Sequence, residues 1–188
     1  QSNPPPRLAQ SLDALIAGPY SSVHDVYKGA KEIPLGIYCR KSMMKYLDPE
    51  DIFQITKQGF EYFEKVFGLA YPFEKYDQIA VVDFNFGAME NAGAVTFRED
   101  VLVFRSHMPE KAYLSRANTI LHEMAHMWFG DMVTMFWWDD LWLNESFAEW
   151  SSYLALSEST RFKGAWTEFN SARKNWAYRQ DQLSSTHP

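Results

Sequence analysis

The hydrophobic pattern at the start of the chain favours short strands. Small apolar runs alternate with polar residues over residues 8–41. The clearest runs are Leu12 to Ile16 and Ile33 to Arg40, with turn signals at Gly18-Pro19 and Lys28-Gly29. This stretch therefore predicts a strand-rich beginning.

A long helical stripe of apolar residues comes next. Asp48-Pro49 is typical of a helix start, with the aspartate as N-cap and the proline at the first helical position. Gly68 is expected to end this helix. The stripe consists of Ile52, Ile55, Phe60, Phe63 and Phe67.

The middle of the chain returns to strand patterns. Gln78 to Phe84, Val95 to Phe97 and Val101 to Phe104 are expected to be strands. Residues 87–93 are expected to form a loop, because two glycines bracket small and polar residues.

The last third of the chain has helical patterns. One helix is expected from about Pro109 to Phe129, closed by Gly130. A second is expected from near Asn144 to about Glu158, and a third over roughly residues 161–180. Strands followed by helices predict an α+β domain.

Composition narrows the class of protein. Hydrophobic residues make up 46% and aromatic residues 16% of 188 residues, which is enough for the core of one domain. The net charge of −6 argues against a nucleic-acid partner. No apolar run approaches the roughly 18 residues of a membrane helix, so no membrane segment is expected. The single cysteine, Cys39, fits a reducing compartment, which predicts a cytoplasmic location.

The central chemical motif is His122-Glu123-Met124-Ala125-His126. Residues four apart lie one turn apart on the same helix face, so both imidazoles can point at one ion. Glu123 can then reach a water on that ion without binding the ion itself. The pairing favours a metal site over ordinary helix histidines. The histidines without such partners are expected to be ordinary residues: His24, His107 and His187.

Glu145 is the expected third ligand, at the start of the next helix. Two histidines and a glutamate leave a fourth position open, as in a catalytic rather than a structural zinc site. One zinc ion is therefore the expected cofactor, although nickel or cobalt would fit the same ligands.

Acidic residues dominate the region around the motif. Residues 117–160 contain seven acids and neither lysine nor arginine. Solvation remains an alternative for some of these acids: Asp131, Asp139, Asp140 and Glu158. Zinc-bound imidazoles normally donate their other N–H to a carboxylate or carbonyl. The candidates for such supporting contacts are Asn144, Asp139, Asp140 and Glu149.

Tryptophans are frequent in the same region. They are expected to be core and packing residues around a dry cavity. These residues are Trp128, Trp137, Trp138, Trp142 and Trp150.

Three segments together carry a family resemblance. They are the zinc motif continued to Asp131, the run from Trp137 to Glu145, and Gly87-Ala88-Met89-Glu90-Asn91. From about Leu15 to its end, the chain resembles the aminopeptidase N family of gluzincin zinc metallopeptidases. The resemblance implies a thermolysin-like catalytic domain, in which a sheet-containing lobe precedes a helical lobe and zinc lies between them.

The resemblance also implies roles for residues. Glu123 would be the general base, and the zinc ligands would be His122, His126 and Glu145. In the loop, Glu90 would bind the free α-amine of a peptide, whereas by itself it reads as a turn residue. The other loop residues expected to bind substrate are Gly87, Ala88, Met89 and Asn91. The implied activity is that of a zinc aminopeptidase of the membrane alanyl type.

The sequence departs from the family pattern in a few places. Ser146 stands where glycine is common, and the family's downstream tyrosine is not found. We expect residues 1–20 to be a tag remnant and the terminal strand of a preceding β domain. Residues 21–188 would be an incomplete catalytic domain, truncated on its C-terminal side. Without the parent's N- and C-terminal domains, weak or no activity is expected.

Three alternatives remain open at this point. A thermolysin-like endopeptidase would share the zinc site, although the Glu90 loop argues against it. The leukotriene-hydrolase branch of the same family adds epoxide hydrolysis. The chain could also bind metal without catalysis.

Overall fold

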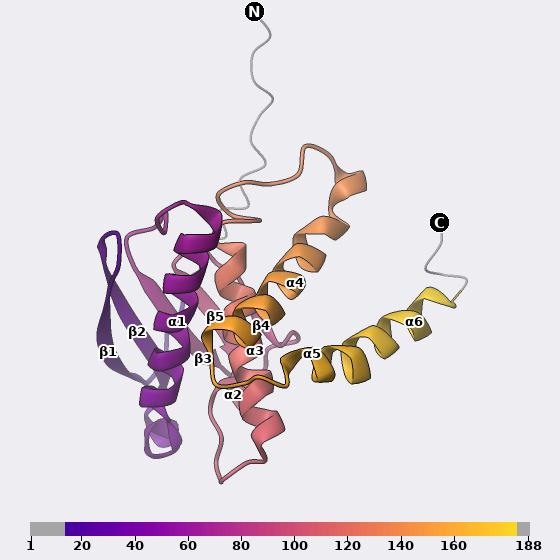
Figure 1. Cartoon of the computed structure of the whole chain (residues 1–188). Coiled ribbons are helices and arrows are strands. Elements are labelled where there is room, and N and C mark those ends of the chain that lie inside the picture. Colours follow the sequence, from indigo (N-terminus) through magenta and orange to yellow (C-terminus); the bar gives the residue numbers. More distant parts are fainter. Residues whose placement is uncertain (1–13, 184–188) are drawn as a thin grey trace, which may run out of the picture.

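The computed structural model describes residues 14–183, which form a mixed sheet covered by helices (Figure 1). The strands are β1 (Tyr20–Lys28), β2 (Glu32–Arg40), β3 (Tyr76–Val81), β4 (Ala88–Met89) and β5 (Ala94–Arg98). The α-helices are α1 (Pro49–Phe67), α2 (Glu99–Leu102), α3 (Glu110–His126), α4 (Trp142–Ser159), α5 (Ala165–Glu168) and α6 (Asn175–Asp181). Two short 3₁₀ helices are η1 (Lys41–Tyr46) and η2 (Trp138–Asp140), and η3 (Phe169–Lys174) is a π-helical segment. The predicted α+β class is confirmed.

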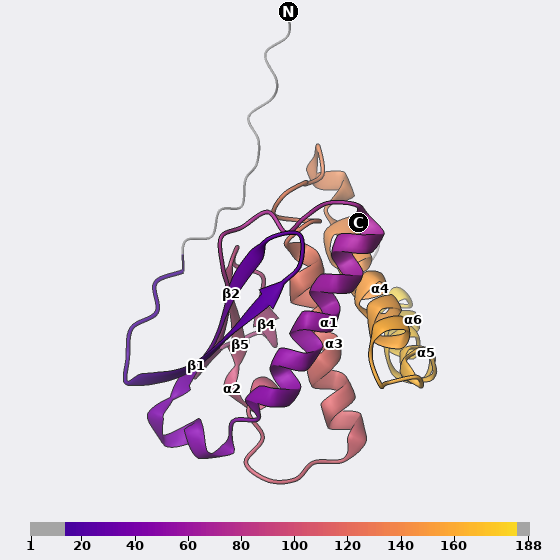
Figure 2. The ribbon, with the colours of Figure 1, turned by 60° about the vertical axis from the view of Figure 1, so that its left-hand side comes forward.

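The five strands lie in the order β1-β2-β3-β5-β4. β1 and β2 form an antiparallel hairpin, while β2, β3 and β5 run parallel. The two-residue strand β4 is antiparallel to β5 and forms the edge of the sheet. Helices α1 and α3 pack side by side against the sheet, and α4 lies on their far side (Figure 2).

The core fills the space between the sheet and α1 and α3. Phe60 of α1 is fully buried, and its ring centroid lies 4.9 Å from that of Tyr71 and 5.2 Å from that of Tyr76. Each such edge-to-face pair stabilises the fold by about 0.5–1.5 kcal/mol beyond the contribution of the apolar area that it buries. Gly59 lets α3 approach, because a Cβ built there would lie 2.6 Å from Leu121 Cδ2.

The first long helix follows the sequence closely. α1 begins with Pro49 and ends at Gly68, whose left-handed φ of 66° suits glycine. Asp48 occupies the N-cap position, but its side chain makes no capping hydrogen bond. Instead, Asp48 Oδ2 accepts a hydrogen bond from buried Arg116 of α3 at 2.8 Å. A tertiary ion pair therefore replaces the expected cap.

Two strand predictions are wrong. Val101 to Phe104 is not a strand, because the chain turns into α2 straight after β5. Glu99 binds Arg40 through two hydrogen bonds of 2.7 Å, and Leu102 is buried one turn later. The strand expected over residues 12–16 is also absent from its described part, where Leu15 is exposed; residues 12 and 13 lie outside the described range.

Other boundaries shift. β3 starts at Tyr76 and ends at Val81, and the expected 87–93 loop contains β4 because Ala88 and Met89 pair with β5. The third expected helix starts only at Ala165 and is interrupted by η3. Among the described residues, no helix is both long and apolar enough to span a membrane.

Candidate metal centre

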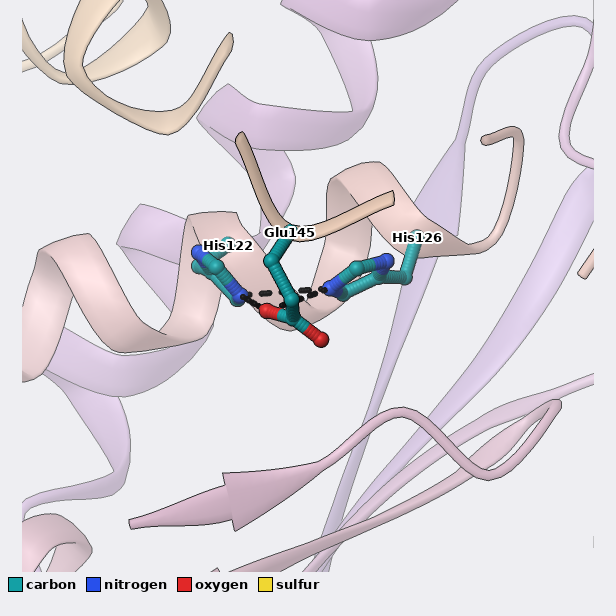
Figure 3. Close-up of side chains that lie close together, drawn as sticks. All are labelled: His122, His126 and Glu145. Carbon is teal, nitrogen blue, oxygen red and sulfur yellow. Dashed lines mark hydrogen bonds and ion pairs between the residues drawn. The ribbon is translucent and has the colours of Figure 1, made fainter. Parts of the chain in front are cut away.

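Helix α3 holds the two histidines of the motif in a buried position. His122 and His126 lie one turn apart, with side chains 16% and 1% exposed. Their Nε2 atoms are 3.2 Å apart and point toward the same spot (Figure 3). The predicted shared helix face is therefore present.

Glu145 reaches this spot from the first turn of α4. Its Oε2 lies 3.0 Å from His122 Nε2 and 3.6 Å from His126 Nε2. Zinc bonds of about 2.0–2.1 Å in tetrahedral geometry place neighbouring ligand atoms about 3.3 Å apart. The three separations bracket this value, so the donor set fits a zinc ion. Within the described residues, these three side chains are the one group placed to hold a metal.

The other nitrogen of each ring has an acceptor. His122 Nδ1 lies 3.0 Å from Glu149 Oε2, and His126 Nδ1 lies 3.2 Å from the carbonyl oxygen of Phe129. When each Nδ1–H donates to these oxygens, Nε2 keeps its lone pair for an ion. The contacts thus fix both rings in the orientation and tautomer that metal binding requires.

The four candidates for supporting contacts lie in different places. Glu149 contacts the candidate ligand His122, as described above. Asn144 is buried, and its Oδ1 has no hydrogen-bond partner among the described residues. Asp139 and Asp140 are exposed in η2, and no contact with either histidine is present in the described structure.

Gly130 allows the chain to turn closely around the site. Its φ is 133°, a backbone conformation that residues other than glycine rarely adopt. A Cβ built there would lie 2.7 Å from Asn144 Oδ1 and 3.1 Å from His126 Nδ1. Glycine therefore lets the turn after α3 pass between the candidate ligand His126 and the start of α4.

Charges in the site are strongly coupled. Burial lowers the pKa of His122, but hydrogen bonds to Glu145 and Glu149 outweigh it and raise that pKa to about 10. The same histidine contacts hold the pKa of Glu145 well below its usual range. Without an ion, a proton on His122 thus balances the charge of the carboxylates beside it; a bound cation would take over this role.

Glu123 and Glu90 face a shared cleft. Burial raises the pKa of Glu123 to about 7, despite the opposing effect of His122. Glu90 is 9% exposed and lies on the loop after β4. The cleft encloses about 490 Å³ and is lined by Phe86, Ala88, Met89, Glu90, His122, Glu123, Leu141, Asn144 and Glu145.

The loop residues divide between the cleft and the sheet. Ala88 and Met89 line the cleft. Asn91 is turned away, because its Nδ2 donates to Thr96 Oγ1 at 3.2 Å. The carbonyl oxygen of Gly87 accepts a hydrogen bond from the Arg98 N–H at 2.8 Å. These two contacts tie the loop to β5.

Sequence reasoning missed three residues of the site, one of which is Leu141, whose side chain lines the cleft. Phe86 lines the cleft although it precedes the recognised loop motif. Arg173 of η3 pairs with Glu149, with 3.0 Å between Nε and Oε1. Arg173 lies 24 residues after Glu149, and no sequence motif links the two residues. The only available signal was the lack of lysine and arginine among the acids of residues 117–160.

The tryptophans are only partly as predicted. Trp128 is buried and packs in the core. The other four are exposed by 48–66%, so the prediction that they pack around a dry cavity is wrong for this chain: Trp137, Trp138, Trp142 and Trp150. Trp137, Trp138 and Trp142 lie on or next to the connection between α3 and α4, whereas Trp150 lies in the middle of α4.

A sheet-and-helix domain with a cleft of histidines and glutamates is typical of metallopeptidases. The model of the peptidase family M1 domain matches residues 52–188. Aminopeptidase N of Streptomyces lividans is 57% identical over 98% of the chain, which spans 22% of that protein. Mouse (Mus musculus) aminopeptidase N is 36% identical over 97% of the chain, which spans 19% of that protein. A probable aminopeptidase 2 of Sulfurisphaera tokodaii is 38% identical over 97% of the chain and 23% of that protein.

These matches show the family. The chain belongs to the peptidase M1 family, the aminopeptidase N family of gluzincin metallopeptidases. It spans about a fifth of the length of the curated relatives that it matches.

Proposed function

We propose that the chain is the zinc-binding part of an aminopeptidase that hydrolyses the first peptide bond of peptides with a free N-terminus. One observation carries this proposal: His122 and Glu145 of the candidate zinc ligand set line one cleft together with the buried Glu123 and Glu90. The aminopeptidase relatives support the same reading.

The chemistry divides between a metal and side chains of the chain. A zinc ion held by His122, His126 and Glu145 would polarise the scissile carbonyl and lower the pKa of water. Glu123 would accept the proton of the attacking water and pass it to the leaving amine, for which a pKa near neutrality is suited. Glu90 would pair with the ammonium group of the peptide and so select its first bond.

The finer domain organisation is part of the proposal. Residues 21–188 would belong to a thermolysin-like domain, with the zinc between sheet-containing and helical lobes. The predicted boundary after residue 20 moves to residue 19, because Tyr20 already pairs with Arg40 in β1; residues before it would belong to a preceding β domain, and residues 1–13 lie outside the described range. A cytoplasmic location remains a prediction.

For the 188-residue chain alone we propose weak activity. Among the described residues, the cleft lining contains no tyrosine, lysine or arginine to stabilise an oxyanion. Loss of one such donor costs about a hundred- to a thousand-fold in rate. The rest of the parent protein would supply the missing groups.

Two measurements test the function. Elemental analysis of the purified chain should find about one zinc per chain. The full-length parent should hydrolyse an aminoacyl anilide with a free amine but not its N-acetylated form, because only the former offers an ammonium group to Glu90. Equal rates on both substrates would favour the endopeptidase alternative and contradict the proposed aminopeptidase activity.

Glu123→Gln tests the proton-transfer role. The amide keeps the shape of the side chain but cannot accept the proton, so kcat of the full-length protein should fall by about a hundred- to ten-thousand-fold. Zinc content should stay near one per chain, because Glu123 is not a ligand. Near-normal turnover with full zinc content would remove Glu123 from the mechanism.

A further inference from the structure

The carboxylate of Glu149 bridges a candidate zinc ligand and a distant arginine. Glu149 Oε2 lies 3.0 Å from His122 Nδ1, and its Oε1 lies 3.0 Å from Arg173 Nε. Oε1 accepts no hydrogen bond from any described residue, so its contact with the guanidinium is ionic. Each oxygen of Glu149 therefore has one partner, a ring on one side and a cation on the other.

Arg173 is held where it can restrain this carboxylate. It lies on η3, and Tyr153 of α4 contacts its guanidinium. The Tyr153 hydroxyl in turn donates to Glu168, which lies just before η3. Segments of π-helix are rare and occur frequently at functional sites. Here the segment directs an arginine toward the back of the candidate site.

The charge distribution around Glu149 explains why its pair with Arg173 matters. No lysine or arginine occurs between residues 117 and 160, so neither α4 nor the C-terminal half of α3 supplies a lysine or arginine to Glu149. Glu149 lies one turn after Glu145 on α4, and its side chain is 24% exposed. A glutamate in this position has several rotamers, and only some of them reach His122. An ion pair on the second oxygen favours the rotamer that does.

We propose that Arg173 is a positioning residue: by pairing with Glu149, it fixes the carboxylate that orients the His122 ring for zinc. The inference rests on the proposed function, because it assigns a role toward the same metal. Arg173 itself contacts neither histidine in the described structure. Its influence would pass through Glu149 alone.

A simple electrostatic effect predicts the opposite sign. An arginine near a zinc site repels the ion, so its removal should tighten zinc binding. Loss of positioning should weaken it, since contacts behind a metal ligand contribute about ten- to a hundred-fold to metal affinity. Arg173 acts one contact further out, and we expect about a three- to ten-fold effect. The direction of the change therefore separates the two explanations.

The experiment measures zinc affinity of the 188-residue chain by competition with a chromophoric chelator. Arg173→Gln should weaken zinc binding by about three- to ten-fold, and Arg173→Lys should recover part of the loss. The matched control is Arg98→Gln, because Arg98 is 45% exposed against 50% for Arg173 and pairs with Asp100 away from the histidines. This control should leave zinc affinity unchanged.

A double-mutant cycle shows whether the effect passes through Glu149. Glu149→Gln should weaken zinc binding by about ten- to a hundred-fold, and Arg173→Gln should then add nothing. As an independent readout, the hydrogen-bonded Nδ1–H of His122 in the zinc-loaded chain should exchange faster with water in Arg173→Gln than in the unsubstituted chain. If circular dichroism shows that Arg173→Gln is unfolded, Tyr153→Phe provides the test, with a smaller loss in the same direction.

The outcomes separate this inference from the proposed function. Unchanged or tighter zinc binding by a folded Arg173→Gln overturns the positioning role, and so does an equal loss in the Glu149→Gln background. If the unsubstituted chain binds no zinc, the proposed metal site itself fails. The role of Arg173 is tested only by the ratio of the zinc affinities of the variant and the unsubstituted chain.

Discussion

Two groups of aromatic residues in this chain lie in opposite environments. In the first, buried rings surround Phe60 between the sheet and the helices: Tyr27, Tyr71, Tyr76 and Trp128. In the second, the connection between α3 and α4 exposes Phe136, Trp137, Trp138 and Trp142 by 57–79%. Figure 1 shows this connection extending beyond the packed helices. Aromatic residues therefore form a core only where another element covers them.

The difference also separates the two sides of the candidate metal site. The histidines belong to buried α3, whereas Glu145 lies in the first turn of α4, next to the exposed aromatic connection, and its side chain is 67% exposed. The packing of α3 holds the two histidine donors in place. The third donor depends on how the first turn of α4 is held.

The largest loss of stability should come from truncating a ring of the buried group, with a ring of the exposed group as its control. Phe60→Ala should destabilise the chain by about 3–5 kcal/mol, because it leaves a cavity among packed rings. Phe136→Ala should change stability by no more than about 0.5 kcal/mol, since this side chain is 79% exposed. Urea unfolding measures both. Similar losses would show that the exposed group is covered in solution and would break the comparison.

Breaking an ion pair inside the packed region should cost less stability than truncating Phe60 but more than breaking a surface ion pair. Asp51 accepts a hydrogen bond from buried Arg116 at 2.7 Å and also binds Arg161. Asp51→Asn should cost about 2–3 kcal/mol, less than a fully unpaired buried charge because Asp48 still contacts Arg116. The control Asp25→Asn should cost less than about 1 kcal/mol, since its pair with Lys57 is over a third exposed.

The Asp51 effect should also depend on pH. Burial raises the pKa of Asp51, but the bonds from Arg161 and Arg116 outweigh it, so this pKa lies below 3.8 in the folded chain. The ionised carboxylate therefore contributes stability above about pH 3.8, and the contribution disappears as pH falls through the folded pKa. Unfolding curves of the unsubstituted chain and Asp51→Asn should converge in acid. A gap that persists at the lowest pH would mean that the charge is not its source.

The smallest effect should come from one added methyl group. Gly59→Ala brings a Cβ to 2.6 Å from Leu121 Cδ2 and 2.8 Å from Met124 Sδ, both buried side chains. We expect a loss of about 1 kcal/mol, because the overpacking exceeds the gain in helix propensity. Gly164→Ala meets nothing within 4 Å and should be neutral or slightly stabilising. A stabilising Gly59→Ala would show that α1 and α3 are less closely packed.

The sequence predicted those features that local patterns determine. α1 could be placed from its apolar stripe, Pro49 and Gly68, and the two histidines could be paired from the helical repeat alone. Val101 to Phe104 could not be recognised as non-strand, because the ion pair between Glu99 and Arg40 joins residues 59 apart in the chain. Arg173 was missed for the same reason. The exposure of the tryptophans depends on which elements cover them, and spacing along the chain carries no such information.

One edge of the sheet has a consequence for handling the protein. β1 is nine residues long and, among the described strands, pairs only with β2, so its outer backbone groups offer a template for another strand. Asp25 lies in the middle of β1, and its Oδ1 accepts the Val26 N–H at 2.7 Å. A charged side chain on an edge strand opposes self-association. Solubility of concentrated samples should thus depend on a carboxylate outside the candidate metal site.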